Sequence, residues 1–78
     1  MSKSAAALLL EDRIGETFTA ITTGAAPKGT WVRLLEIPVE GRLVEGFVGV
    51  DVGDRLRVTL KRVDVNEGFI DFIKARSA

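Results

Sequence analysis

The sequence predicts an all-β domain in which five short strands, preceded by a short helix, close into a small barrel. From residue 15 onward, apolar and polar residues alternate with the period of two that is typical of half-buried strands. Glycine, proline and asparagine interrupt the alternating runs at short intervals, as turns do. Five twisted strands in so short a chain bury their apolar sides only by closing on themselves.

Length and composition exclude many classes of protein. The chain has 78 residues, which is room for one domain, and its 46% hydrophobic and 28% charged residues suit a folded one. It holds neither Cys nor His, which excludes disulfides, the usual zinc sites, thiol nucleophiles and histidine acid–base chemistry. Eleven basic and eleven acidic residues cancel, so binding to nucleic acid would need local clustering of cations.

Residues 4–13 are predicted to form a helix, because Ser4 suits its cap, alanine and leucine favour it, and Gly15 stands just beyond its end. Its expected apolar side consists of Ala5, Leu8, Leu9 and Leu10. This side would pack on the barrel or close its end. Alternatively, the helix continues a longer one in a parent protein. We therefore divide the chain into a helical lead, residues 1–13, and a barrel, residues 14–78.

The first two strands are predicted at residues 16–23 and 28–34, with a turn at 24–27. In the first strand, Phe18, Ala20 and Thr22 share the inward face. The second strand sends Val32 and Leu34 inward and sends Trp31 and Arg33 outward, because successive side chains alternate. The second strand thus has a core face and a solvent face.

Three further strands complete the predicted barrel, at residues 41–44, 55–61 and 69–73. Pro38 keeps residues 36–40 out of a central strand, and three glycines make residues 45–54 an irregular connector. Residues 66–68 favour a hairpin turn. The inward residues expected in these strands are Leu43, Leu56, Val58, Leu60, Ile70 and Phe72. The whole pattern is that of an OB-fold-like barrel, with an SH3-like barrel as the alternative.

The outward residues are the candidates for function. An aromatic ring stacks on bases and cations follow phosphates, so Trp31 beside Arg33 suits a binder of nucleic acid. A solvated strand or a protein contact is the alternative. Four cations, Arg55, Arg57, Lys61 and Arg62, stand within eight residues, either as a basic stripe or as a solvated strand face that discourages edge pairing. We expect several cations, Arg33 and Arg42 included, to converge near Trp31.

Catalysis, metals and membranes are not expected. The acidic residues are spread over turns and strands rather than gathered as two-metal chemistry needs. Neither a phosphate-binding glycine loop nor a dinucleotide fingerprint occurs, so no cofactor is predicted. The apolar run at residues 5–10 is too short to cross a bilayer, and we expect a cytoplasmic protein.

Several motifs resemble those of a known family. GE at residues 15–16, KGTWV at 28–32, EGRLV at 40–44, GD at 53–54 and VD at 63–64 resemble the ribosomal S1-type RNA-binding OB domain, over most of residues 15–73. SAAALL at 4–9, RIGE at 13–16, PVEG at 38–41 and GFIDF at 68–72 resemble the C-terminal end of exoribonucleases of the ribonuclease II and R family. The resemblance implies a module that grips single-stranded RNA while a separate, magnesium-dependent domain degrades it from 3′ to 5′.

Carried over residue by residue, the S1 pattern matches this chain in part. Trp31 and Asp64 stand where the pattern has an aromatic and an aspartate. Lys28 stands where it has its first aromatic, Val44 where it often has a histidine, and Phe69 where it has a basic residue. The resemblance therefore implies stacking at Trp31, with weaker binding or a shifted footprint.

The leading hypothesis is a single-stranded RNA-binding barrel without catalytic residues. Its predicted RNA-binding residues are Lys28, Trp31, Arg33, Arg42, Arg57, Lys61, Asp64 and Phe69. A second hypothesis is a docking module that contacts the catalytic domain of a parent exoribonuclease through the helix and Trp31. An independent nuclease is the third option.

Overall fold

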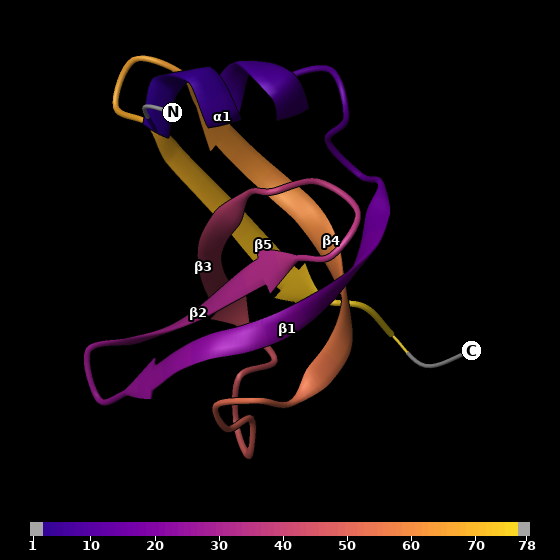
Figure 1. Cartoon of the computed structure of the whole chain (residues 1–78), viewed down its shortest axis with the longest axis vertical. Coiled ribbons are helices and arrows are strands. Elements are labelled where there is room, and N and C mark those ends of the chain that lie inside the picture. The colour runs from indigo at the N-terminus through magenta and orange to yellow at the C-terminus, as the bar shows by residue number, and fades with distance from the viewer. Residues whose placement is uncertain (1–2, 77–78) are drawn as a thin grey trace.

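The chain folds into a closed barrel of five strands with one helix across its end (Figure 1). The computed structural model describes residues 3–76, and their side chains from residue 6 onward. The elements are α1 (Lys3–Leu10), β1 (Thr17–Ala26), β2 (Gly29–Leu34), β3 (Glu40–Glu45), β4 (Arg55–Asp64) and β5 (Phe69–Lys74). Around the barrel the strands follow the order β1, β2, β3, β5, β4.

The barrel is closed because each of its strands pairs with two neighbours. β1 lies between β2 and β4 and is antiparallel to both, and β5 lies between β4 and β3. Among the described strands, β3 and β5 form the single parallel pair. Parallel strands need a long connection, and here β4 and its loops provide the connection from the end of β3 to the start of β5. This strand order is that of an OB-fold, so the predicted fold class is confirmed over the SH3-like alternative.

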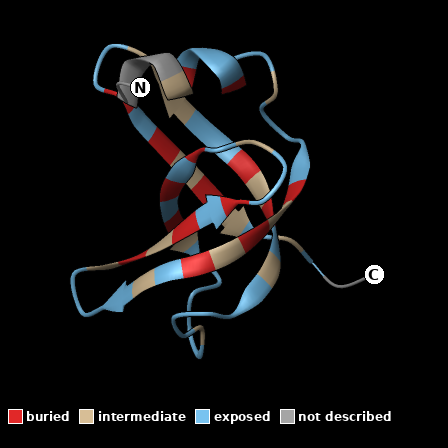
Figure 2. Ribbon diagram, in the orientation of Figure 1, coloured by how far each residue is buried: buried red, intermediate tan, exposed pale blue. Residues whose placement is uncertain are grey.

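The core lies inside the barrel, where the alternating pattern places it (Figure 2). Phe18 and Phe72 are the largest fully buried side chains. The aliphatic residues around them are Ala20, Val32, Leu34, Val39, Leu43, Val58, Leu60 and Ile70. Of the residues predicted to point inward, Leu56 alone is only half-buried, and it still packs against this core. Full burial of one such side chain contributes about 1.5–3 kcal/mol, so these residues hold the barrel together.

Three β-bulges interrupt the alternation in the described strands. The additional residues are Thr23 in β1, Val44 in β3 and Lys61 in β4, as the register of the paired strands shows. In β4, strict alternation after Leu60 would turn Arg62 into the core. The bulge at Lys61 keeps Arg62 exposed and lets Val63 pack against the core instead.

Helix α1 packs over the barrel end that β4 and β5 form, which is the first of its two expected arrangements (Figure 1). Its buried residues are Ala7 and Leu10, whereas Leu8 is 55% exposed and Leu9 is 52% exposed. The prediction that Leu8 and Leu9 form the packing side is therefore wrong. The buried residues Ala7 and Leu10 are instead three positions apart, and residues at this spacing lie on one side of a helix. The helix includes Lys3, so Ser4 does not precede it as a cap would; the side chains of Ser4 and Ala5 lie outside the described residues.

Helix α1 also ends at Leu10, three residues earlier than predicted. Arg13 turns away to donate a 2.9 Å hydrogen bond to Glu16, which raises the pKa of the guanidinium, and its Cζ lies 4.8 Å from the ring centre of Phe18. These contacts place Arg13 over the barrel wall rather than in a helix. No helix in the part of the chain that the structure describes is long and apolar enough to span a membrane.

The strand ends differ from the prediction mainly in β1 and β4. β1 continues to Ala26 and shortens the predicted turn to Pro27 and Lys28, and β4 continues to Asp64, three residues beyond its predicted end. The connector between β3 and β4 is irregular, as predicted, and its Asp54 carboxylate accepts a 2.9 Å hydrogen bond from the Asp51 amide. The hairpin turn before β5 is also confirmed, because Gly68 has a φ of 73° that glycine adopts without strain.

Candidate nucleic-acid interface

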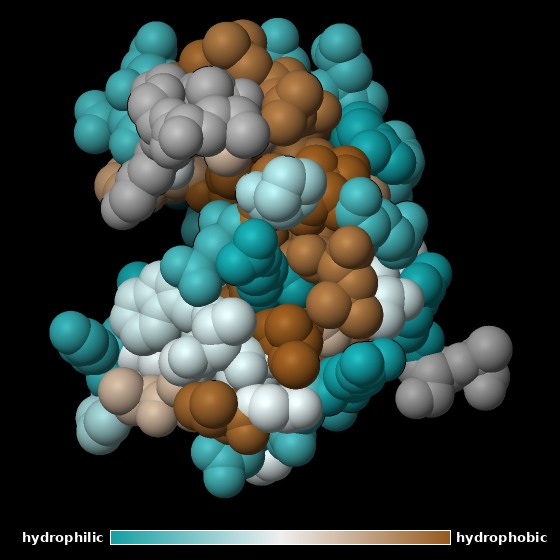
Figure 3. Space-filling view, viewed as in Figure 1, coloured by the Kyte–Doolittle hydropathy of each residue, from teal (hydrophilic) through white to brown (hydrophobic). Residues whose placement is uncertain are grey.

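An open groove of about 630 Å³ crosses the outer surface of the barrel over β2, β3 and β5. Two aromatic side chains, Trp31 and Phe69, line it together with charged and small residues. The lining of this Trp31 groove is Ala6, Trp31, Pro38, Glu40, Gly41, Arg42, Val44, Arg62, Gly68, Phe69, Ile70 and Asp71. Figure 3 shows the surface hollowed on this side of the molecule, between the helix end and the β1–β2 hairpin.

Strand pairing sets one row of residues across all five strands. From β1 to β4, the directly paired residues are Gly24, Trp31, Arg42, Asp71 and Arg62. Residues that face each other on neighbouring strands project to the same side of a sheet. The indole therefore shares the outer surface with the three charged side chains of this row. Trp31 itself is half-buried rather than taken into the core, as the prediction of an outward indole requires.

Gly29 makes room for the indole, and Gly24 of the neighbouring strand lies beside it. A Cβ on Gly29 would stand 2.8 Å from Cη2 of Trp31, and one on Gly24 would stand 3.4 Å from its Cε3. The benzo edge of the ring thus lies over the backbone of β1 and β2, where a side chain at residue 29 would displace it. This arrangement fixes the orientation of the ring.

Arg42 holds the indole from the next strand. Its Cζ lies 5.8 Å from the ring centre, within the range of a cation–π contact. Its Nη2 also donates a 2.9 Å hydrogen bond to the carbonyl oxygen of Lys28 at the hairpin turn. The guanidinium is therefore anchored beside the ring.

Arg62 occupies the far side of the groove and was absent from the predicted site, although it belongs to the predicted basic stripe. Its Nη2 lies 3.6 Å from Oδ2 of Asp64, and its Nη1 lies 3.8 Å from Oδ2 of Asp71. The bulge at Lys61 turns it outward, and no feature of the sequence reveals that bulge. Its two ion pairs are long and partly exposed, so they contribute little stability and leave the guanidinium available to a ligand.

Charges in the Trp31 groove are nearly balanced. The lining contains two guanidinium groups, Arg42 and Arg62, and two carboxylates, Glu40 and Asp71. Glu40 also accepts a 2.7 Å hydrogen bond from the hydroxyl of Thr23, the bulged residue of β1. The groove therefore offers aromatic surface with alternating charge rather than a strongly positive channel.

Four other predicted residues lie in or beside the groove. Phe69 lines it and is 52% exposed, which leaves its ring free for contact. Lys28 is exposed at the turn of the β1–β2 hairpin, and Arg33 is exposed one outward position from Trp31, opposite Glu40. Asp64 pairs with Arg62 and accepts a 3.0 Å hydrogen bond from the Glu67 amide, so it also shapes the hairpin before β5.

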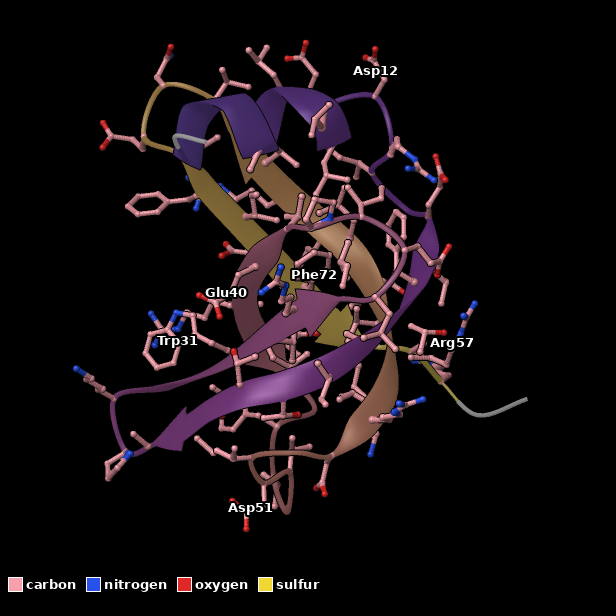
Figure 4. All side chains as sticks on the ribbon, in the orientation of Figure 1. Asp12, Trp31, Glu40, Asp51, Arg57 and Phe72 are labelled. Carbon is pink, nitrogen blue, oxygen red and sulfur yellow. The ribbon has the colours of Figure 1, made fainter. Side chains whose placement is uncertain are left out.

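The remaining two predicted residues do not converge on Trp31 as expected. Lys61 forms a 3.2 Å ion pair with Glu45 and is not part of the groove lining. Arg57 lies on the other side of the barrel, where its Nη1 donates a 2.7 Å hydrogen bond to the hydroxyl of Thr19 (Figure 4). The expectation of one shared face is wrong for Arg57, because β4 curves around the barrel and its two ends face in different directions.

The groove combines aromatic rings with guanidinium groups. Its two rings offer stacking surfaces, and its guanidinium groups suit phosphate oxygens. Among the described residues, no group of three or more carboxylates stands close enough to hold a metal ion.

Fold and groove together define the class as an OB-fold domain with two aromatic residues in an open surface groove. Residues 16–75 match the family described as the RNase II-type exonuclease C-terminal S1 domain, and the chain belongs to this family. The match is to an accessory RNA-binding domain and not to a catalytic one. No curated protein matches the sequence significantly.

Solved structures share the fold at low sequence identity. RNase R of Mycoplasma genitalium superimposes in its apo form with a TM-score of 0.76 and 19% identity, over 94% of this chain and 15% of that one. The same enzyme in complex with ribose-methylated single-stranded RNA superimposes with a TM-score of 0.78 and 18% identity, with the same coverage of both chains. The uncharacterized protein MJ1198 of Methanocaldococcus jannaschii superimposes with a TM-score of 0.67 and 22% identity, over 85% of this chain and 96% of that one. The chain thus spans about 15% of the RNase R chain that it resembles.

Proposed function

We propose that this chain binds single-stranded RNA through the Trp31 groove and acts as an RNA-gripping module of an exoribonuclease. The observation that carries the proposal is the presence of two partly exposed rings, Trp31 and Phe69, in one open groove. The family of the chain and the single-stranded RNA in the structure of M. genitalium RNase R support it.

The proposed mode of binding follows from the groove. One base stacks on the indole of Trp31 and a second contacts Phe69, which requires bases that are not paired in a duplex. Arg42, anchored beside the indole, contacts the adjacent phosphate, and Arg62 contacts the backbone farther along. Lys28 and Arg33 extend this contact toward the hairpin. Since stacking tolerates every base, we expect little sequence preference.

In this account the chain holds RNA, and a catalytic domain elsewhere in the enzyme hydrolyses it from the 3′ end. The part of RNase R that the chain resembles is an accessory domain, which supports a role without catalysis. A cytoplasmic location stays a prediction of the sequence.

The test is the affinity for a fluorescent oligouridylate of about twelve nucleotides, a length within the site sizes of such barrels. A stacked base contributes roughly 1–3 kcal/mol, so Trp31→Ala should weaken binding roughly 5- to 150-fold. Phe47→Ala is the matched control, since Phe47 is an exposed aromatic residue of the connector outside the groove. Equal affinities for the wild type and Trp31→Ala would refute the proposal.

Docking on a parent exoribonuclease is a second candidate function, which the exposed leucines of α1 favour. Leu8 and Leu9 project away from the barrel, and the chain spans only a small part of an RNase R. The proposed occupant of this surface is the catalytic domain of such an enzyme. A ribonuclease II/R enzyme that lacks its own S1 domain should bind the wild type with little dependence on salt. It should not bind a Leu8→Ser, Leu9→Ser variant, and a lack of binding to the wild type would refute docking.

A further inference from the structure

A second groove, of about 390 Å³, lies between the connector, the start of β4 and the end of β5. Four cations line this basic groove, namely Arg55, Arg57, Lys74 and Arg76. Figure 4 shows Arg57 on the opposite side of the barrel from Trp31. None of these four residues lines the Trp31 groove, so the two surfaces are separate.

Backbone pairing brings the four cations together. Arg55 and Arg57 are two residues apart on the outward face of β4, where they pair with Ile21 and Thr19 of β1. Lys74 is paired with Val58 at the end of β5. The amide of Ala75 then donates a 2.9 Å hydrogen bond to the carbonyl oxygen of Arg57, which holds the next residue, Arg76, beside the groove.

The positive charge of this groove is not neutralised within the described part of the chain. Its one lining carboxylate, Asp54, accepts a hydrogen bond from the Asp51 amide. None of the four cations forms an ion pair with a described carboxylate, and Arg57 donates to a neutral hydroxyl. In the Trp31 groove, by contrast, cations and carboxylates alternate. The chain has no net charge, yet an excess of positive charge collects on this side.

The basic groove contains no aromatic residue, so it offers cations without a surface for stacking. Three of its cations are arginines, whose planar forks fit the oxygens of a phosphodiester. Groups that contact phosphate but not bases position a nucleic acid without reading its sequence. We propose that the basic groove is a second RNA site, which binds the phosphate backbone of single-stranded or duplex RNA independently of base identity.

A short RNA duplex tests this site apart from the Trp31 groove, because paired bases cannot stack on Trp31. If the proposed function is wrong, Trp31→Ala will bind single-stranded RNA as tightly as the wild type does. If the present inference is wrong, the failure will be seen in the binding of the duplex instead. The variant is Arg55→Gln combined with Arg76→Gln, since both residues are exposed and Arg57 keeps its contact with Thr19. The control is Arg13→Gln, an exchange in the segment between α1 and β1.

The expected result is a change in salt dependence. If each of the four cations neutralises one duplex phosphate, affinity should fall about 150-fold between about 50 and about 200 mM salt. With two contacts removed, the same salt step should lower affinity only about 12-fold. Arg13→Gln should keep the salt dependence of the wild type. Circular dichroism on each variant verifies that the fold is retained.

Two results would overturn the inference. One is that the double variant shows the same salt dependence of duplex binding as the wild type, or that Arg13→Gln reduces this dependence as much as the double variant does. The other is binding of an oligoglutamate peptide in place of the duplex, which would identify the groove as a surface for an acidic protein segment.

Discussion

The indole of Trp31 lies over the backbone of Gly29, two residues earlier on the same strand, so closely that a Cβ there would stand 2.8 Å from ring atom Cη2. The ring is thus positioned by the absence of a side chain. Gly29 does not have a positive φ, so the reason for glycine at this place is the space that the ring occupies.

This contact predicts that Gly29→Ala weakens binding of single-stranded RNA while the barrel stays folded. The added methyl group displaces the indole and crowds Nε of Arg42, at 3.2 Å, so its three nearest atoms all belong to surface side chains. We expect a shifted emission spectrum of Trp31 and a loss of affinity for oligouridylate. Gly24→Ala should have a smaller effect, since its Cβ would stand 3.4 Å from the ring, an ordinary contact. An equal effect of the two exchanges would contradict the role assigned to Gly29.

A carboxylate in the groove opposes binding of phosphate. Asp71 stands between Arg42 and Arg62 in the row across the sheet. Two unit charges about 4 Å apart in water interact with about 1 kcal/mol, which is about fivefold in affinity. Asp71→Asn should therefore strengthen RNA binding by up to about fivefold at low salt. Asp12→Asn, at an exposed residue after α1, should leave the affinity as it is. Weaker binding by Asp71→Asn would show that the carboxylate contacts a base.

Helix α1 is predicted to stabilise the barrel through one leucine. Leu10 is fully buried at the end of the barrel, and Leu9 beside it is 52% exposed. Leu10→Ala should lower the free energy of unfolding by about 2–5 kcal/mol, because it removes buried methyl groups and leaves a cavity. Leu9→Ala should change it by less than about 0.5 kcal/mol. Urea unfolding monitored by circular dichroism measures the free energy of unfolding of both variants. Similar losses of stability in the two variants would contradict the burial of Leu10 against the barrel.

The barrel could be predicted from the sequence because the signal for it is local. Alternation is read within each strand, and it correctly assigned Phe18, Val32 and Phe72 to the core. The packing side of α1 could not be read in the same way. Leu8, Leu9 and Leu10 are equally apolar, and only the position of the barrel decides that Leu10 is buried.

The groove could be predicted only in part. Trp31 and Arg42 were expected on one surface, and the structure places them there. Alternation assigns a side chain to the outside of a barrel but not to one side of it, which is why Arg57 was expected beside Trp31. Arg62 depends on the bulge at Lys61, which forms from the fit between β4 and β5 and not from any local pattern.

The most direct test of the account is the fluorescence of Trp31 during titration with single-stranded RNA. Trp31 is the sole tryptophan and the chain has no tyrosine, so the emission reports on this one ring. If bases stack on the indole, oligouridylate at low salt should change the emission in a saturable way, whereas an RNA duplex should leave it nearly unchanged. An emission that stays constant while single-stranded RNA is bound would contradict the central claim.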